Sequence, residues 1–182
     1  MFVAESLAAA FADDAAFTAL FPADTAQALA AWFAAVVEVF CACDLARLAI
    51  RGHAAAIWTT GDCPARVERL DDRLFEVINR YGGPGGVEFA AAISEAADTP
   101  APGSWVLHWI GTPHADRRAG HGRRLLSHIL RDAAEAGAPL WTTTTNPAAV
   151  RLYTGLGMVA RAERAVAGRA GLNCWTLSSG GS

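Results

Sequence analysis

The last third of the sequence alternates between strand-like and helix-like patterns, and this alternation restricts the fold more than any other feature. Apolar runs rich in β-branched and aromatic residues are separated by an amphipathic stretch and by a short stretch that begins with proline. This order favours an α/β domain with at least one parallel pair of strands. The predicted segments are a strand over Trp105–Thr112, a helix over Gly120–Ala136, a strand over Leu140–Thr145, a helix over Pro147–Leu156, and strands over Met158–Ala167 and Leu172–Leu177.

The part of the chain before residue 104 is predicted to be mainly helical around one hairpin. Two helices are expected over residues 5–43, separated at Phe21-Pro22, and a two-stranded hairpin over Leu45–Thr60 turns at Gly52. Helices are also expected over Arg66–Arg80 and Val87–Ala97. A length of 182 residues fits one domain spanning residues 1–182.

A glycine-containing turn lies between a predicted strand and a predicted helix, at Arg117-Arg118-Ala119-Gly120-His121-Gly122-Arg123-Arg124. Two glycines let the backbone bend tightly and leave no Cβ in the way of a ligand. The free amides of the first helical turn and four nearby arginines favour a pyrophosphate there. A simple strand-to-helix turn with solvated arginines is the alternative.

Two common nucleotide loops are excluded. The dinucleotide-binding fingerprint needs a third glycine where this chain has Leu125. A Walker loop needs lysine, and all 15 basic residues of the chain are arginine. The absence of lysine also excludes Schiff-base chemistry on the protein.

Two motifs instead resemble the GNAT superfamily of N-acetyltransferases. Arg117-x-x-Gly120-x-Gly122 is similar to its Gln/Arg-x-x-Gly-x-Gly/Ala pyrophosphate loop. The segment from Asn146 through Tyr153 to Met158 is similar to its Asn-x-x-Ala-x-x-x-Tyr-x-x-x-Gly-Phe segment, with Met158 in place of phenylalanine. The resemblance covers residues 104–177, which would carry the cofactor-binding core. It implies a GNAT fold: a mixed central sheet with a splayed parallel strand pair and flanking helices.

The amino-terminal half resembles antibiotic-modifying members of the family, the puromycin N-acetyltransferases among them, over Leu7–Asp13 and His53–Trp58. Two departures stand out. The family opens with a strand before its first helix, whereas this sequence begins almost directly in a helix. The family's Val-x-Pro before the loop reads Thr112-Pro113-His114 here, with the proline one place early.

The resemblance implies a site for acetyl-CoA at the end of the first strand of the parallel pair. The backbone of this segment would bind the pantetheine arm as an added strand would, and the amides of the following loop would bind the pyrophosphate. Asn146 would bind the arm or cap the helix that begins at Pro147, of which capping is the favoured role. The predicted cofactor-binding residues are Ile110, Gly111, Thr112, Arg117, Arg118, Ala119, Gly120, His121, Gly122, Arg123 and Asn146.

The resemblance makes Tyr153 the acid that protonates the departing thiolate. A base for the incoming amine is less evident, because neither strand of the expected parallel pair contains a carboxylate. His108 is the predicted substitute, since imidazole titrates near neutral pH and strand alternation places it with Val106, Ile110 and Thr112. A structural histidine is the alternative, and His114, His121 and Glu88 are weaker candidates.

The sequence thus predicts an acetyl-CoA-dependent N-acetyltransferase that acts on a small amine by direct attack in a ternary complex. A CoA-binding module without catalysis and a protein N-terminal or lysine acetyltransferase are the alternatives. Aromatic residues are expected to supply the acceptor pocket: Trp32, Phe33, Trp58, Phe75, Trp105, Trp109, Trp141 and Trp175.

The remaining expectations concern partners and location. A formal net charge of −3 with scattered arginines argues against a nucleic-acid partner. No stretch reads as a signal peptide or a membrane span, so a cytoplasmic protein is expected, and a homodimer is left open. No metal site is expected, because the spacing of the cysteines matches neither a metal knuckle nor a disulfide framework, and these are predicted to be buried thiols: Cys41, Cys43, Cys63 and Cys174.

Overall fold

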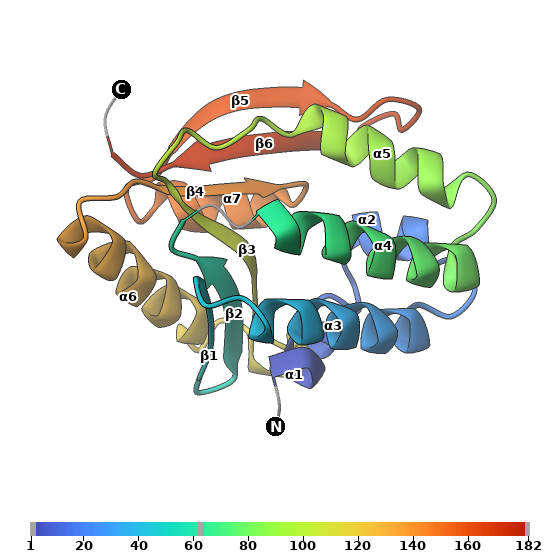
Figure 1. The fold of residues 1–182 in the computed structure, drawn as a ribbon, viewed down its shortest axis with the longest axis horizontal. Helices are drawn as coiled ribbons and strands as arrows, with labels where there is room; N and C mark the ends of the chain where they lie inside the picture. The colour runs from blue at the N-terminus through green and yellow to red at the C-terminus, as the bar shows by residue number, and fades with distance from the viewer. Residues whose placement is uncertain (1–2, 62–63, 181–182) are drawn as a thin grey trace.

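The computed structural model describes residues 3–61 and 64–180, and for residues 64–69 and 71 it describes the backbone alone. A six-stranded mixed sheet runs through the molecule with helices on both of its faces (Figure 1). Its strand order is β1-β2-β3-β4-β6-β5, and β3 and β4 form the one parallel pair. The predicted α/β class and mixed sheet are therefore confirmed. The strands are β1 (Ala46–Arg51), β2 (Ala54–Thr59), β3 (Trp105–Gly111), β4 (Leu140–Thr144), β5 (Val159–Ala165) and β6 (Asn173–Ser178).

Three helices precede the sheet rather than the two expected: α1 (Val3–Ala10), α2 (Ala15–Leu20) and α3 (Thr25–Cys41). The additional break follows from local capping. The carboxylate of Asp14 accepts hydrogen bonds from the amides of Ala16 and Phe17, so a new helix starts there. Asp24 caps α3 in the same way through the amide of Gln27. The first described element is a helix, as the sequence suggested.

The remaining helices agree with the expected segments to within two residues at their starts. They are α4 (Pro64–Tyr81), α5 (Gly86–Ala96), α6 (His121–Glu135) and α7 (Pro147–Thr154), and a short 3-10 turn covers His114–Asp116. The β1–β2 hairpin turns at Gly52, whose φ of 61° suits glycine. No helix in the described ranges is both long and apolar enough to cross a bilayer.

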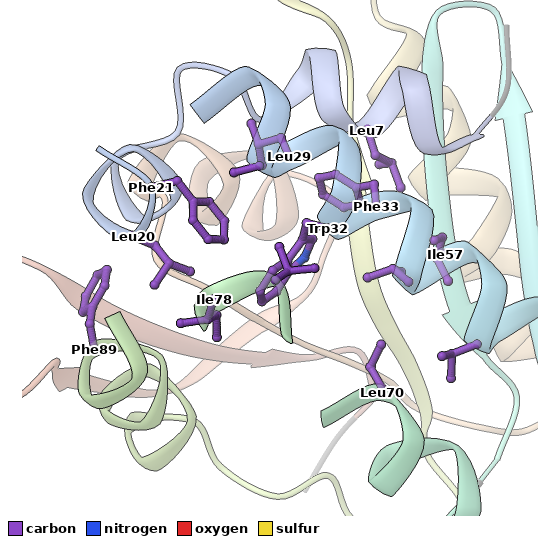
Figure 2. Packing of buried hydrophobic residues seen from close by; sticks show 14 of the residues in the cluster. Leu7, Leu20, Phe21, Leu29, Trp32, Phe33, Ile57, Leu70, Ile78 and Phe89 are labelled. Carbon is purple, nitrogen blue, oxygen red and sulfur yellow. The ribbon is translucent and has the colours of Figure 1, made fainter. Parts of the chain in front are cut away.

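Two hydrophobic cores flank the sheet. One joins α1–α5 to the sheet and holds the large buried side chains of α3, Phe33 and Phe40 (Figure 2). The other lies beneath α6 and α7 and includes Leu126, Ile129 and Tyr153. Helices such as α1 and α6 bury their apolar stripes against the sheet, whereas α4 packs mainly against α3 and α5.

The cysteines depart partly from the prediction. Cys43 and Cys174 are buried free thiols, as expected, whereas Cys41 is exposed because it is the last residue of α3. Cys63 lies outside the described residues.

Candidate active site

The turn between β3 and α6 has an unusual backbone. Both Arg118 (φ 66°) and Gly120 (φ 79°) adopt left-handed conformations. For a residue with a Cβ this costs about 1–2 kcal/mol. Strain of this kind is kept where the backbone geometry itself has a use, such as an anion-binding concavity of successive amides.

The amides of residues 118–123 are available to such an anion. None of these amides donates a hydrogen bond to a backbone carbonyl in the described part of the chain. The first amide of α6 that donates to the carbonyl four residues earlier is that of Arg124, which bonds Gly120. They stand at the N-terminus of α6, where the helix dipole is positive. A Cβ on Gly122 would lie 3.2 Å from the hydroxyl of Thr112, so only glycine fits comfortably. A diphosphate therefore fits this turn.

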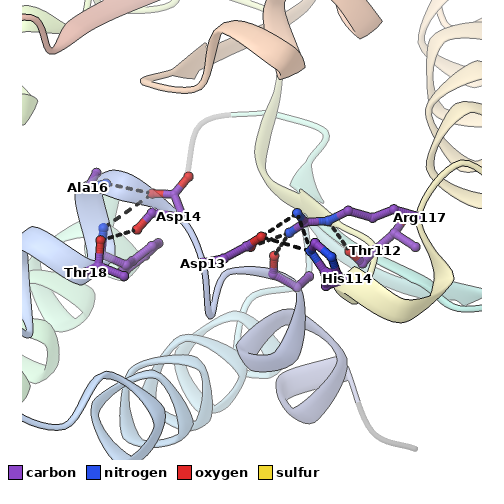
Figure 3. A network of polar contacts seen from close by, with 9 residues as sticks. Asp13, Asp14, Ala16, Thr18, Thr112, His114 and Arg117 are labelled. Atoms are coloured by element: carbon purple, nitrogen blue, oxygen red, sulfur yellow. Dashed lines mark hydrogen bonds and ion pairs between the residues drawn. The ribbon is translucent and has the colours of Figure 1, made fainter.

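Arg117 makes a contact that the sequence did not predict. Its guanidinium forms a two-pronged ion pair with Asp13 from the α1–α2 turn, with 2.6 Å between Nη1 and Oδ2, and also donates to the carbonyl of Ala10 at 2.9 Å (Figure 3). This arginine holds the pKa of Asp13 down, at about 2. The side chain of Arg117 thus ties α1 to the turn, and a direct contact with a phosphate stays a prediction.

Three other basic side chains of this region also have protein partners. Arg123 donates to the carbonyl of Gly155 at 3.2 Å, and Arg124 lies 3.0 Å from Nδ1 of His121. His114 is paired with Asp13. None of the three weaker base candidates, His114, His121 and Glu88, is among the described residues that line the main cavity.

The two parallel strands separate, as the GNAT resemblance implied. Their register ends at the pair Leu107–Thr142, although β3 continues to Gly111 and β4 to Thr144. At this fork the hydroxyl of Thr142 donates to the carbonyl of Leu107 at 2.9 Å. Beyond the fork, the backbone groups of both strands that face each other are open to a ligand.

A cavity of about 910 Å³ passes through the fork. At one end it is lined by Ile110–Thr112, Gly122 and Asn146, which are predicted cofactor-binding residues. At the other it is bounded by side chains from α2, α3, α4 and α5. The cavity therefore connects the predicted cofactor site with a pocket large enough for a small molecule.

Tyr153 reaches this cavity from α7, on the α6 side of the sheet. The residue is only 5 % exposed, and burial raises the pKa of its phenol to about 12. The nearby hydroxyl of Thr142 offsets part of this rise in the pKa. That hydroxyl donates to the carbonyl of Leu107 at the fork. The sequence showed Thr142 only as part of a threonine run, so its role was missed.

His108 lines the same cavity from the opposite face. Trp58 of β2 pairs with Leu107 and Ile57 pairs with Trp109, so His108 is the extra residue of a β-bulge. The bulge turns both His108 and Trp109 toward α3, where the imidazole lies 4.8 Å from the ring of Phe40.

The prediction that strand alternation places His108 with Ile110 was therefore wrong. Ile110 packs in the core beneath α6, on the other side of the sheet. The imidazole Nε2 lies 3.1 Å from the hydroxyl of Thr59, which is buried on β2.

Asn146 has the predicted capping role. Its side-chain oxygen accepts the amide of Ala148 at 2.9 Å, and Pro147 occupies the first turn of α7. Its side chain also lies near Asp14, and burial raises the pKa of that carboxyl. The two helix caps therefore meet at the cofactor end of the cavity.

Comparison with known proteins identifies this arrangement. Residues 78–158 match the model of the acetyltransferase (GNAT) family, and the matched range contains both β3 and β4, the glycine turn and Tyr153. Over this range, which is less than half of the chain, the sequence is similar to the GNAT acetyltransferases. The protein is accordingly an acyltransferase, and members of this family take their acetyl group from acetyl-CoA.

Solved structures support the GNAT fold over the whole chain. The histone acetyltransferase HPA2 and related acetyltransferase from Corynebacterium glutamicum is 19% identical, with a TM-score of 0.68, and the alignment covers 99% of this chain and 90% of that one. At this identity the likeness shows the fold of the GNAT domain alone.

Two other matches are more distant. Nourseothricin acetyltransferase is 25% identical over 42% of this chain and 49% of that one, with a TM-score of 0.37. The ribosomal-protein-S18-alanine N-acetyltransferase from Escherichia coli is 16% identical over 80% and 78%, with a TM-score of 0.47. No curated protein matches the sequence.

Proposed function

We propose that this acetyltransferase transfers the acetyl group to the amine of a small molecule, by direct attack in a ternary complex. The observation that carries the proposal is the single cavity that runs from the glycine turn through the fork to the pocket beneath α4 and α5. It brings an imidazole and a phenol to opposite sides of one space.

The residues for the cofactor are those at the turn and the fork. The amides of residues 118–123 bind the pyrophosphate, and the backbone of Ile110, Gly111 and Thr112 binds the pantetheine arm. When bound, acetyl-CoA supplies the thioester carbonyl that the amine attacks. Since α1–α5 complete the pocket that this core opens into, residues 1–182 work as one domain in this proposal.

The protons are handled by two side chains. His108 accepts the proton of the incoming ammonium, and Tyr153 gives the proton of its Oη to the departing thiolate. A carbon–nitrogen bond forms and the carbon–sulfur bond breaks, so an ammonium and acetyl-CoA yield an amide, CoA and one proton. His108 suits the role of base because it is the one histidine among the described residues that line the cavity.

A small acceptor is favoured over a polypeptide by the shape of the pocket. Leu20, Trp32, Ile78 and Ile93, from four different helices, border its far end. A cavity of about 910 Å³ is of the size that small-molecule sites have. A protein N-terminus or a lysine of a protein is the second candidate and would need a groove for the chain that follows it.

The pH dependence of the reaction tests the assignment of the base. We expect His108→Gln, which keeps a hydrogen-bonding side chain beside Thr59, to remove an acid limb from the kcat/KM profile. Two amines of different pKa are compared, because a limb that belongs to the acceptor moves with the amine whereas one that belongs to the enzyme stays. Mass spectrometry of the acetylated amine and thiol release measure the reaction. A fixed acid limb that persists in His108→Gln excludes this histidine as the base.

Thr142 offers a second test at the fork. Once Tyr153 has given up its proton, the hydroxyl of Thr142 can turn from Leu107 and donate to the phenolate, and a hydrogen bond to a charged group is worth about 1.5–3 kcal/mol. We expect Thr142→Val to lower kcat about tenfold with little change in KM, and Thr142→Ser to restore most of it. Equal rates for the valine and serine variants would show that the hydroxyl has no part in the reaction.

A further inference from the structure

The walls of the acceptor pocket restrict what it can bind. We infer that the acceptor is a small aromatic monoamine, an inference that rests on the proposed function and names its substrate class. Two features of the cavity carry it: its aromatic surface and the pairing of its carboxylates.

Aromatic side chains supply much of the surface. Phe17 meets Trp32 edge to face with 5.5 Å between ring centroids, and Phe11 meets Phe17 in the same way at 5.5 Å. Ring contacts of this kind fix the wall in one arrangement and present faces and edges to a flat ligand. Phe75 of α4 lines the cavity as well and is 51 % exposed. The aromatic residues of the lining are Phe11, Phe17, Trp32, Phe75, Trp109, Trp141 and Tyr153.

The carboxylates of the lining are mostly neutralised. Asp13 is paired with Arg117, and Asp98 is paired with Arg164. Within the described residues, only Asp14 lines the cavity as a carboxylate with no arginine in ion-pair contact. One such carboxylate matches one ammonium group. A polyamine or an aminoglycoside would bring several ammonium groups into a cavity that could not pair them, at a large cost in desolvation.

Two tryptophans of the wall keep their N–H groups buried. The indole N–H groups of Trp32 and Trp141 have no hydrogen-bond partner among the described residues. A third such group, on Trp58, belongs to the core beneath α6 and is not part of the cavity lining. An indole N–H cannot accept a hydrogen bond from an ammonium. Because these N–H groups are buried, Trp32 and Trp141 present ring surface to the cavity, and ring surface suits an aromatic body. The pocket is therefore complementary to a flat body with a single amine.

A panel of acceptors tests the inference on the full-length protein. Thiol release is measured with tryptamine and 2-phenylethylamine, with spermidine and kanamycin, and with a lysine-containing peptide. We expect kcat/KM for the two aromatic monoamines to exceed that for the other three by about tenfold or more. Calorimetry of tryptamine with the protein saturated with CoA gives a readout that does not depend on turnover.

A matched pair of variants then tests the charge argument. Ser94 lies exposed on α5 and lines the cavity, so Ser94→Glu adds an unpaired carboxylate while Ser94→Gln adds a neutral side chain of the same size. We expect Ser94→Glu to raise the ratio of spermidine to tryptamine activity about fivefold or more, since a new close charge pair near a protein surface is worth about 1 kcal/mol or more. Ser94→Gln should leave the ratio unchanged.

The outcomes separate the two proposals. Higher kcat/KM for spermidine, kanamycin or the peptide than for tryptamine would overturn the inference while leaving an amine acetyltransferase in place. A ratio unaffected by Ser94→Glu would also count against it. Failure of every amine in the panel, with CoA binding intact, would overturn the proposed function itself.

Discussion

Replacing Gly122 with glutamate is expected to abolish acetyl-CoA binding, with an increase in Kd of about a hundredfold or more. A Cβ at this position would lie 3.2 Å from the Thr112 hydroxyl, and Gly122 lines the cavity, so we expect the longer side chain to occupy the space beside the amides. There its carboxylate opposes the charge of a diphosphate. Two unit charges 4 Å apart repel by about 4 kcal/mol near a protein surface. Isothermal titration calorimetry with CoA measures the loss.

The control variant for Gly122→Glu lies on the same helix. Ala134 is exposed near the far end of α6, and Ala134→Glu adds the same charge without approaching the turn. We expect its affinity for CoA to stay within about twofold of the wild type, because exposed charges at this separation are largely screened. If Gly122→Glu bound CoA as tightly as Ala134→Glu, the glycine turn would not be the pyrophosphate site.

Loss of the Tyr153 hydroxyl is expected to lower turnover at least about tenfold, or about 1.4 kcal/mol of barrier, with CoA affinity nearly unchanged. The phenol holds a proton beside the fork, and its raised pKa of about 12 keeps that proton bound throughout the usual assay range. Burial in the same cavity also raises the pKa of a thiolate, which favours the transfer. Single-turnover kinetics of Tyr153→Phe measure the chemical step.

Tyr81 provides the matched control, because it is the second of the chain's two tyrosines and ends α4. Tyr81→Phe should retain wild-type turnover.

The wild-type enzyme should also show no alkaline loss of activity from Tyr153 up to about pH 10, since the folded phenol ionises only near pH 12. Unaltered turnover in Tyr153→Phe would remove this residue from the mechanism.

The cofactor half of the site could be predicted because its information is local. Gly120 and Gly122 stand two residues apart at the start of a strongly amphipathic helix, and Asn146-Pro147 marks the start of the next. Capping, glycine geometry and helical period all act over a few residues, so the sequence displays them directly. The order of helices and strands along the last third of the chain, and the presence of a parallel pair, followed from the same patterns.

The other half depends on contacts between distant segments. The partner of Arg117 is Asp13, which lies 104 positions away. The bulge at His108 arises where β2 and β3 pair, so strict alternation gave the wrong face for Ile110. Thr142 belongs to the candidate site because its hydroxyl donates to the carbonyl of Leu107 and lies near Tyr153 in the folded chain. Such pairings are set by tertiary packing, which a reading of one sequence does not contain.

The most direct test of the account is a crystal structure of the protein with CoA bound. We expect the pyrophosphate to accept hydrogen bonds from the amides of residues 118–123 and the pantetheine arm to lie between β3 and β4, with its sulfur within hydrogen-bonding distance of the Tyr153 hydroxyl. A structure in which CoA binds elsewhere, or in which the two strands close on each other beyond Leu107 and Thr142, would contradict it.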